Sequence, residues 1–95
     1  MWIAPEEYKI VGARLEAVRI QAGVTQVELA KRLKKPQSFV SAYERGSRRV
    51  DLLELVRIVT MLGGDPMKVC ASILEEIVPH TRSDSAKLSD KRRKR

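Results

Sequence analysis

The segment that most constrains the fold runs from Thr25 to Gly46, with the sequence TQVELAKRLKKPQSFVSAYERG. Its apolar spacing predicts two short helices joined by a tight turn. Thr25 and Glu28 have the spacing of a capping box, in which each side chain binds the backbone amide of the other residue at a helix start. Residues 34–36 interrupt the pattern because proline restricts the residue before it to an extended backbone. The second helix is therefore expected at residues 37–45.

The rest of the chain also has helical spacing, with no strand-like alternation. Helices are expected at about residues 5–22, 51–62 and 66–79, in addition to the two in the central segment. A length of 95 residues suits one domain. The sequence thus predicts an all-α fold, a compact five-helix domain at residues 1–79. Residues 80–95 contain Leu88 as their one large apolar side chain, so we expect a disordered basic tail there.

The last two helices carry more apolar residues than one small core needs. On the fourth helix the predicted buried face holds Leu52, Leu55, Val56, Val59 and Leu62, and further apolar residues lie on nearly all other sides. On the fifth helix the predicted face holds Cys70, Ile73, Leu74 and Ile77. The surplus suggests a homodimer that forms through the fifth helix and its entry loop.

The positive charge is concentrated in two segments. The formal net charge is +7. Residues 31–49 contribute +6, from seven Lys or Arg and one Glu, and residues 80–95 contribute +5, from seven basic and two acidic residues. The remainder is therefore −4. Such asymmetry indicates a polyanionic partner that meets particular surfaces.

The composition argues against several other classes of protein. A single Cys and a single His cannot form a disulfide or build a metal cluster. No apolar run is long enough to span a membrane, and the N-terminal residues lack the pattern of a signal peptide. We therefore expect a cytoplasmic protein that is not an enzyme, with no cofactor and no membrane partner.

The central segment resembles a known family. The stretch RIQAGVTQVELAKRL followed by QSFVSAYERG is similar to the helix-turn-helix of phage repressors and Cro proteins, the XRE family. The resemblance covers about residues 10–65. It implies a lambda-repressor-like domain that binds double-stranded DNA and inserts the helix at 37–45 into the major groove. The implied function is a sequence-specific transcriptional regulator, expected to act as a repressor on a palindromic operator.

The resemblance also implies a role for individual positions. The base-reading positions of the recognition helix are Gln37, Ser38 and Ala42, whose side chains suit adenine, several base edges and a thymine methyl, respectively. Ser41 is expected to face a phosphate or a base edge. Phe39 is expected either to contact a thymine methyl or sugar, or to pack on the start of its own helix. The positions implied to contact phosphate are Gln26, Lys35, Arg45, Arg48 and Arg49.

Two further features follow from the same comparison. Arg19 and Glu44 match a structural ion pair between the first and third helices. Lys34 stands where the family usually has a glycine with a left-handed backbone, and Pro36 stands where it often has a polar helix cap. The turn is therefore expected to be slightly rearranged or strained.

Two other functions remain open from the sequence. An antitoxin-type interaction module could bind a protein partner as well as DNA. A non-specific nucleic-acid binder would use the same basic surfaces without reading bases. Dependence on salt separates the last alternative from a specific regulator.

Overall fold

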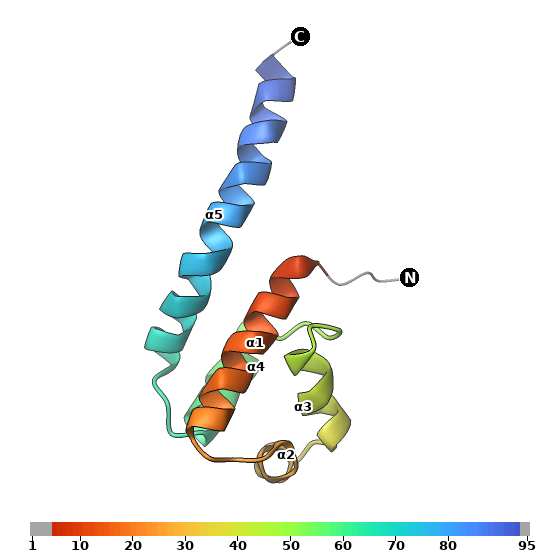
Figure 1. Cartoon of the computed structure of the whole chain (residues 1–95), viewed down its shortest axis with the longest axis vertical. Helices are drawn as coiled ribbons and strands as arrows, with labels where there is room; N and C mark the ends of the chain where they lie inside the picture. Colours follow the sequence, from red (N-terminus) through yellow and green to blue (C-terminus); the bar gives the residue numbers. More distant parts are fainter. Residues whose placement is uncertain (1–4, 94–95) are drawn as a thin grey trace.

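The structure is a computed structural model that describes the backbone of residues 5–93 and the side chains of residues 5–79. This part of the chain forms five α-helices: α1 (Glu6–Gln21), α2 (Gln26–Leu33), α3 (Gln37–Glu44), α4 (Leu52–Met61) and α5 (Pro66–Arg93). The all-α, five-helix prediction is confirmed. Helix α1 packs against α3, α4 and α5, while α2 packs against α3 and α4 (Figure 1).

Local sequence signals set the helix boundaries. Thr25 and Glu28 form the predicted capping box at the start of α2, and Asp51 and Glu54 form an equivalent one at the start of α4. Gly23 has a left-handed backbone after α1, with a φ of 71°. Pro5, expected inside the first helix, instead lies at its N-cap. The capping boxes fix where α2 and α4 begin, and packing then fixes how the helices meet.

One apolar core joins all five helices. Its fully buried large side chains are Tyr43, Leu15, Leu29, Ile58, Val40 and Val59. On α4 the predicted buried face was partly wrong, because Leu52 is 72% exposed and Val56 is 39% exposed. Ile58 takes part in the core instead, since the contacts with α1, α2 and α5 select the face of α4 that carries Leu55, Ile58, Val59 and Leu62. Leu74 of α5, also predicted to be buried, is 48% exposed.

The C-terminal part of the chain differs from the expectation. A disordered tail was expected from residue 80, but α5 continues past Pro79 as helix to Arg93 and projects beyond the other helices (Figure 1). A proline inside a helix removes one hydrogen bond and favours a kink, but it does not forbid continuation. The expectation of disorder rested on the lack of apolar residues that could pack. A projecting helix needs backbone propensity instead, and Ala, Leu, Lys and Arg supply it here.

Among the described residues, no helix is both long and apolar enough to cross a membrane. The described side chains also include no cluster of three or more His, Cys, Asp or Glu that could hold a metal ion.

Candidate nucleic-acid interface

The turn between α2 and α3 keeps the left-handed geometry that the family comparison implied. Lys34, the C-cap of α2, has a φ of 57° and a ψ of 44°. The amides of Lys34 and Lys35 donate to the carbonyls of Lys31 and Ala30, at 3.2 and 3.0 Å, which closes the helix end. Pro36 then precedes α3 without a side-chain cap. Of the two alternatives, the turn is therefore strained rather than rearranged, because a side chain with a Cβ occupies a conformation that suits glycine.

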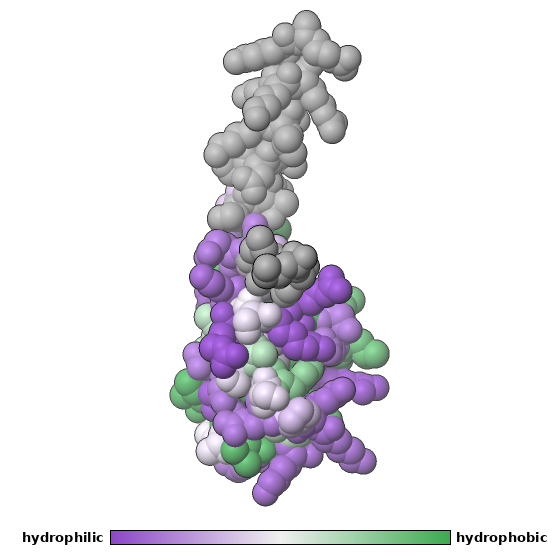
Figure 2. Space-filling view, turned by 90° about the vertical axis from the view of Figure 1, so that its right-hand side faces the viewer, coloured by the Kyte–Doolittle hydropathy of each residue, from purple (hydrophilic) through white to green (hydrophobic). Residues whose placement is uncertain are grey.

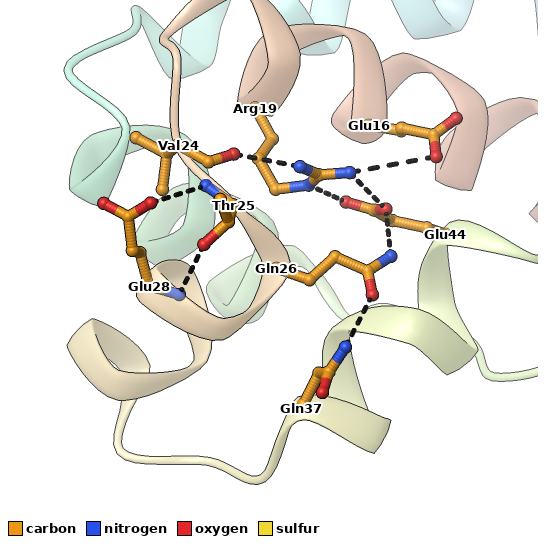
Figure 3. Close-up of polar contacts among 8 residues, drawn as sticks. All are labelled: Glu16, Arg19, Val24, Thr25, Gln26, Glu28, Gln37 and Glu44. Carbon is orange, nitrogen blue, oxygen red and sulfur yellow. Dashed lines mark hydrogen bonds and ion pairs between the residues drawn. The ribbon is translucent and has the colours of Figure 1, made fainter.

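A buried ion pair fixes α3 to α1. Arg19 donates from Nε to Glu44 Oε2 at 2.7 Å and from Nη2 to Oε1 at 3.0 Å, and its Nη1 donates to the carbonyl of Val24 at 2.9 Å (Figure 3). The Glu44 side chain is only 2% exposed. The hydrogen bonds from Arg19 to Glu44 raise the pKa of the Arg19 guanidinium. The pair thus occupies the place that the family comparison implied, and it is fully hydrogen-bonded, as a buried charge must be.

The ion pair continues outward as a chain of side-chain hydrogen bonds. Gln26 donates from Nε2 to Glu44 Oε1 at 2.8 Å, and Gln37 donates from Nε2 to Gln26 Oε1 at 3.3 Å (Figure 3). This connection was not found from the sequence, because Gln26 and Glu44 are 18 positions apart and share no local pattern. It holds the exposed Gln37 at the first turn of α3, with its amide linked through Gln26 to a buried charge.

The other predicted base-reading residues occupy one part of α3. Ser38 is exposed and Ala42 is half-buried. Ser41, also half-buried, accepts a hydrogen bond from Arg45. The exposed start of the helix therefore presents Gln37 and Ser38, whose amide and hydroxyl groups can exchange hydrogen bonds with base edges.

Phe39 has the contacts of a packing residue. Its ring meets the buried ring of Tyr43 edge-on, with the centroids 5.6 Å apart, and borders the core. The Arg48 guanidinium also lies over the Phe39 ring, 4.4 Å from its centroid. Of the two alternatives for Phe39, packing on its own helix is the arrangement that these contacts favour.

Arg48 is engaged within the protein. Besides covering Phe39, it donates from Nη1 and Nη2 to the two carboxylate oxygens of Glu54, at 3.2 and 3.0 Å. Those bonds lower the pKa of the Glu54 carboxyl. The family resemblance implied a phosphate contact for Arg48, and its link to Glu54 was not found from the sequence.

The remaining basic residues lie at the surface around α3. Lys35, Arg45 and Arg49 are exposed. Lys35 follows the turn, and the two arginines follow α3. Figure 2, which views the molecule from the α3 side, shows hydrophilic side chains over much of this face, with a few apolar ones among them. A helix start with polar side chains between two groups of cations is an arrangement that can lie along a nucleic-acid groove.

Comparisons with known proteins agree with this geometry. Residues 15–68 match the helix-turn-helix family model HTH_3. A solved XRE-family like protein from Pseudomonas syringae pv. tomato str. DC3000 is 37% identical, with a TM-score of 0.67, over 75% of this chain and 87% of that one. No curated protein matches the chain.

Two further solved structures are named as regulators. The clp gene regulator ClgR from Corynebacterium glutamicum has a TM-score of 0.69 and 25% identity, over 90% of this chain and 93% of that one. The restriction-modification controller protein C.AhdI from Aeromonas hydrophila has a TM-score of 0.63 and 29% identity, over 68% of this chain and 98% of that one. The matched family model spans more than half of the chain, and the fold and the site geometry agree with it. The chain therefore belongs to the XRE-type helix-turn-helix family of DNA-binding transcription regulators and is not an enzyme.

Proposed function

We propose that this protein is a sequence-specific repressor in the cytoplasm that occupies an operator with α3 in the major groove. The observation that carries the proposal is the hydrogen-bonded chain from Arg19 through Glu44 and Gln26 to Gln37. It restricts an exposed amide at the start of α3, and a pre-positioned amide can form a bidentate pair with adenine. A non-specific binder needs charge but gains nothing from a restrained Gln37.

The proposed contacts divide into two kinds. Gln37, Ser38 and Ala42 read bases, and Ser41 meets a phosphate or base edge. Gln26, Lys35, Arg45 and Arg49 contact phosphates, which supply affinity and register but no sequence choice. The side-chain amide nitrogen of Gln26 already donates a hydrogen bond to Glu44. Its proposed phosphate contact therefore uses its backbone amide at the start of α2, where amides lack helical partners. Arg48 can reach a phosphate only by leaving Glu54.

Two copies are proposed to bind together. Met67 and Leu74, one helical heptad apart on α5, are 80% and 48% exposed. Pairing these faces in a homodimer would bury apolar surface. It would also place two α3 helices on a palindrome, whose half-sites are separated by about 34 Å along the DNA.

The test begins with selection of bound duplexes from a random pool. We expect one enriched, palindromic sequence, and this duplex should stay bound at a salt concentration that releases random DNA. Equal release of both duplexes would favour the non-specific alternative and contradict the proposal.

The role of Gln37 is then tested on the selected duplex. Gln37→Ala should cost about 1–3 kcal/mol of binding free energy and relax the preference at one base pair, because a bidentate contact is lost. Gln21→Ala is the matched control, since Gln21 is exposed and lies beside Lys68 and Val69 of α5. It should change neither quantity. The measurement is competition binding with every base substitution at each position of the half-site. An unaltered base preference in Gln37→Ala would mean that Gln37 does not read a base.

A further inference from the structure

Arg48 and Glu54 form the inner part of a charge cluster that borders the proposed phosphate-binding surface. Both guanidinium Nη atoms bind the carboxylate, and Nη1 also donates to the carbonyl of Arg49 at 2.8 Å. The Phe39 ring covers one face of the guanidinium. The Arg48 side chain is 41% exposed and that of Glu54 is 24% exposed. The arginine is thus fixed by four separate contacts although its charge remains accessible to solvent.

Glu54 is itself held in place. Its Oε1 accepts from the amide of Asp51 at 3.0 Å, and its own amide donates to Asp51 Oδ1 at 2.7 Å. The carboxylate therefore cannot follow Arg48 if that side chain moves toward DNA. The carboxylate can only release the Arg48 guanidinium. A bidentate carboxylate and a phosphate use the same donors of the guanidinium, so the two acceptors compete.

We propose that Glu54 is a specificity-determining residue that withholds Arg48 from the phosphates of non-cognate DNA. A loosely held, random duplex cannot offer a phosphate in the geometry that replaces a bidentate carboxylate stacked on an aromatic ring. The cation therefore adds little to non-specific affinity. This inference rests on the proposed function, because it requires that the surface following α3 faces DNA.

The surrounding charges do not account for this arrangement. The Lys35 ammonium lies 5.6 Å from the centroid of the Phe39 ring. Arg57 lines a small cavity of about 120 Å³ together with Lys35, Phe39 and Glu54. Both cations are exposed. Lys35 acts on Glu54 through its charge, whereas among the described side chains Arg48 is the one that donates hydrogen bonds to it. Of the three, Arg48 is the one that Glu54 binds with both oxygens.

The chain offers a matched pair of variants. Glu54→Gln retains the capping box, since Gln serves at this position as well as Glu. It removes the negative charge that binds Arg48. Glu28→Gln makes the same substitution at the same position of the capping box of α2. Both variants add one unit to the net charge, but only the first releases an arginine that contacts a carboxylate through two nitrogens.

The measurement is the affinity for a random-sequence duplex as a function of salt. Glu54→Gln should steepen the slope of log K against log salt by about 0.9 relative to Glu28→Gln, which corresponds to one additional phosphate contact for each bound protomer. When salt is lowered from 0.2 to 0.05 M, its affinity for the random duplex should therefore rise by about 3.5-fold more than that of the control. Arg48→Ala should leave the wild-type slope unaltered, and adding it to Glu54→Gln should remove the gain.

The possible outcomes separate the two proposals. Equal slopes for Glu54→Gln and Glu28→Gln overturn the role of Glu54, as does a shallower slope for Arg48→Ala alone, which would mean that Arg48 already contacts phosphate. Neither result affects the proposed function if wild type still prefers the selected duplex. If wild type has no preference for any duplex, the proposed function itself fails.

Discussion

Gly12 allows α1 and α3 to approach closely enough for the ion pair to form. A Cβ at this position would lie 2.6 Å from the carbonyl oxygen of Glu44 and would also collide with that of Tyr43. Both obstacles are backbone atoms, which cannot move without shifting α3. The absence of a side chain at Gly12 therefore sets the depth of α3, and with it the position of Glu44 beneath Gln26.

Gly12→Ala should lower the free energy of unfolding by about 3 kcal/mol, because the added methyl group forces the two helices apart. Gly23→Ala is the control for the same substitution. Its added Cβ meets no atom within 4 Å, and its φ is +71°, so only the left-handed backbone is penalised, by about 1 kcal/mol. Urea denaturation of both variants supplies the comparison. Similar losses would mean that the contact between α1 and α3 can relax.

At the residue scale, the charged segments and the helix caps could be predicted from the sequence, whereas most contacts between helices could not. The capping boxes are encoded within four residues, and the Arg19–Glu44 pair came from the family comparison. The links from Glu44 to Gln26 and from Arg48 to Glu54 join residues whose proximity depends on how the helices pack. The crossing at Gly12 was missed for the same reason. A glycine in a helical pattern is a visible signal of close approach, although the sequence does not say which element approaches.

The α2–α3 turn is the element in which local preference and the fold disagree. Lys34 adopts a left-handed backbone with a φ of 57°, although the surrounding helices are right-handed. That conformation costs a non-glycine residue about 1–2 kcal/mol, whereas glycine costs about 0.5–1 kcal/mol through the greater freedom of the unfolded chain. The first effect is larger, so the packing of α2 against α3 maintains a strained turn.

Lys34→Gly should therefore stabilise the protein by about 0.5 kcal/mol, the difference between the two effects. Lys31→Gly removes the same charge from the last turn of α2, where the backbone is helical, and should destabilise it by about 1 kcal/mol. The two variants are matched in charge, so thermal unfolding should separate them while their affinity for random DNA falls alike. Destabilisation of Lys34→Gly to the level of Lys31→Gly would exclude strain in the turn.

The elements also differ in how far the sequence determines their faces. Helices α2 and α3 are short and carry few apolar residues, so spacing leaves little choice for the buried faces that hold Leu29 and Ala30, and Val40 and Tyr43. Helix α4 is apolar on most sides, and spacing alone could not choose between the face with Leu52 and Val56 and the face with Ile58. Its three packing partners make that choice. The extension of α5 past Pro79 was missed because burial was used to judge a segment that has no partner helix in the structure.

For the whole molecule, one α3 helix covers too little DNA to give strong selectivity for one sequence. That selectivity therefore requires that two copies of the protein bind together. The proposed α5 contact makes the two binding events cooperative through effective concentration, a gain of about 10²–10⁴ in affinity. The same contact sets the distance between the two α3 helices. In the proposed dimer, selectivity thus depends on apolar side chains that do not contact DNA.

Leu74→Lys should abolish the homodimer, because a charge would replace apolar contact within the proposed interface. Sedimentation equilibrium should then give a monomer, and affinity for the selected palindrome should fall by at least about 100-fold while affinity for a single half-site is retained. Ile20→Lys is the control: Ile20 is 62% exposed and belongs to α1 rather than to α5, so this variant should leave assembly unaltered. A wild-type protein that sediments as a monomer both free and on the palindrome would contradict the dimer directly, and selection should then recover a single half-site.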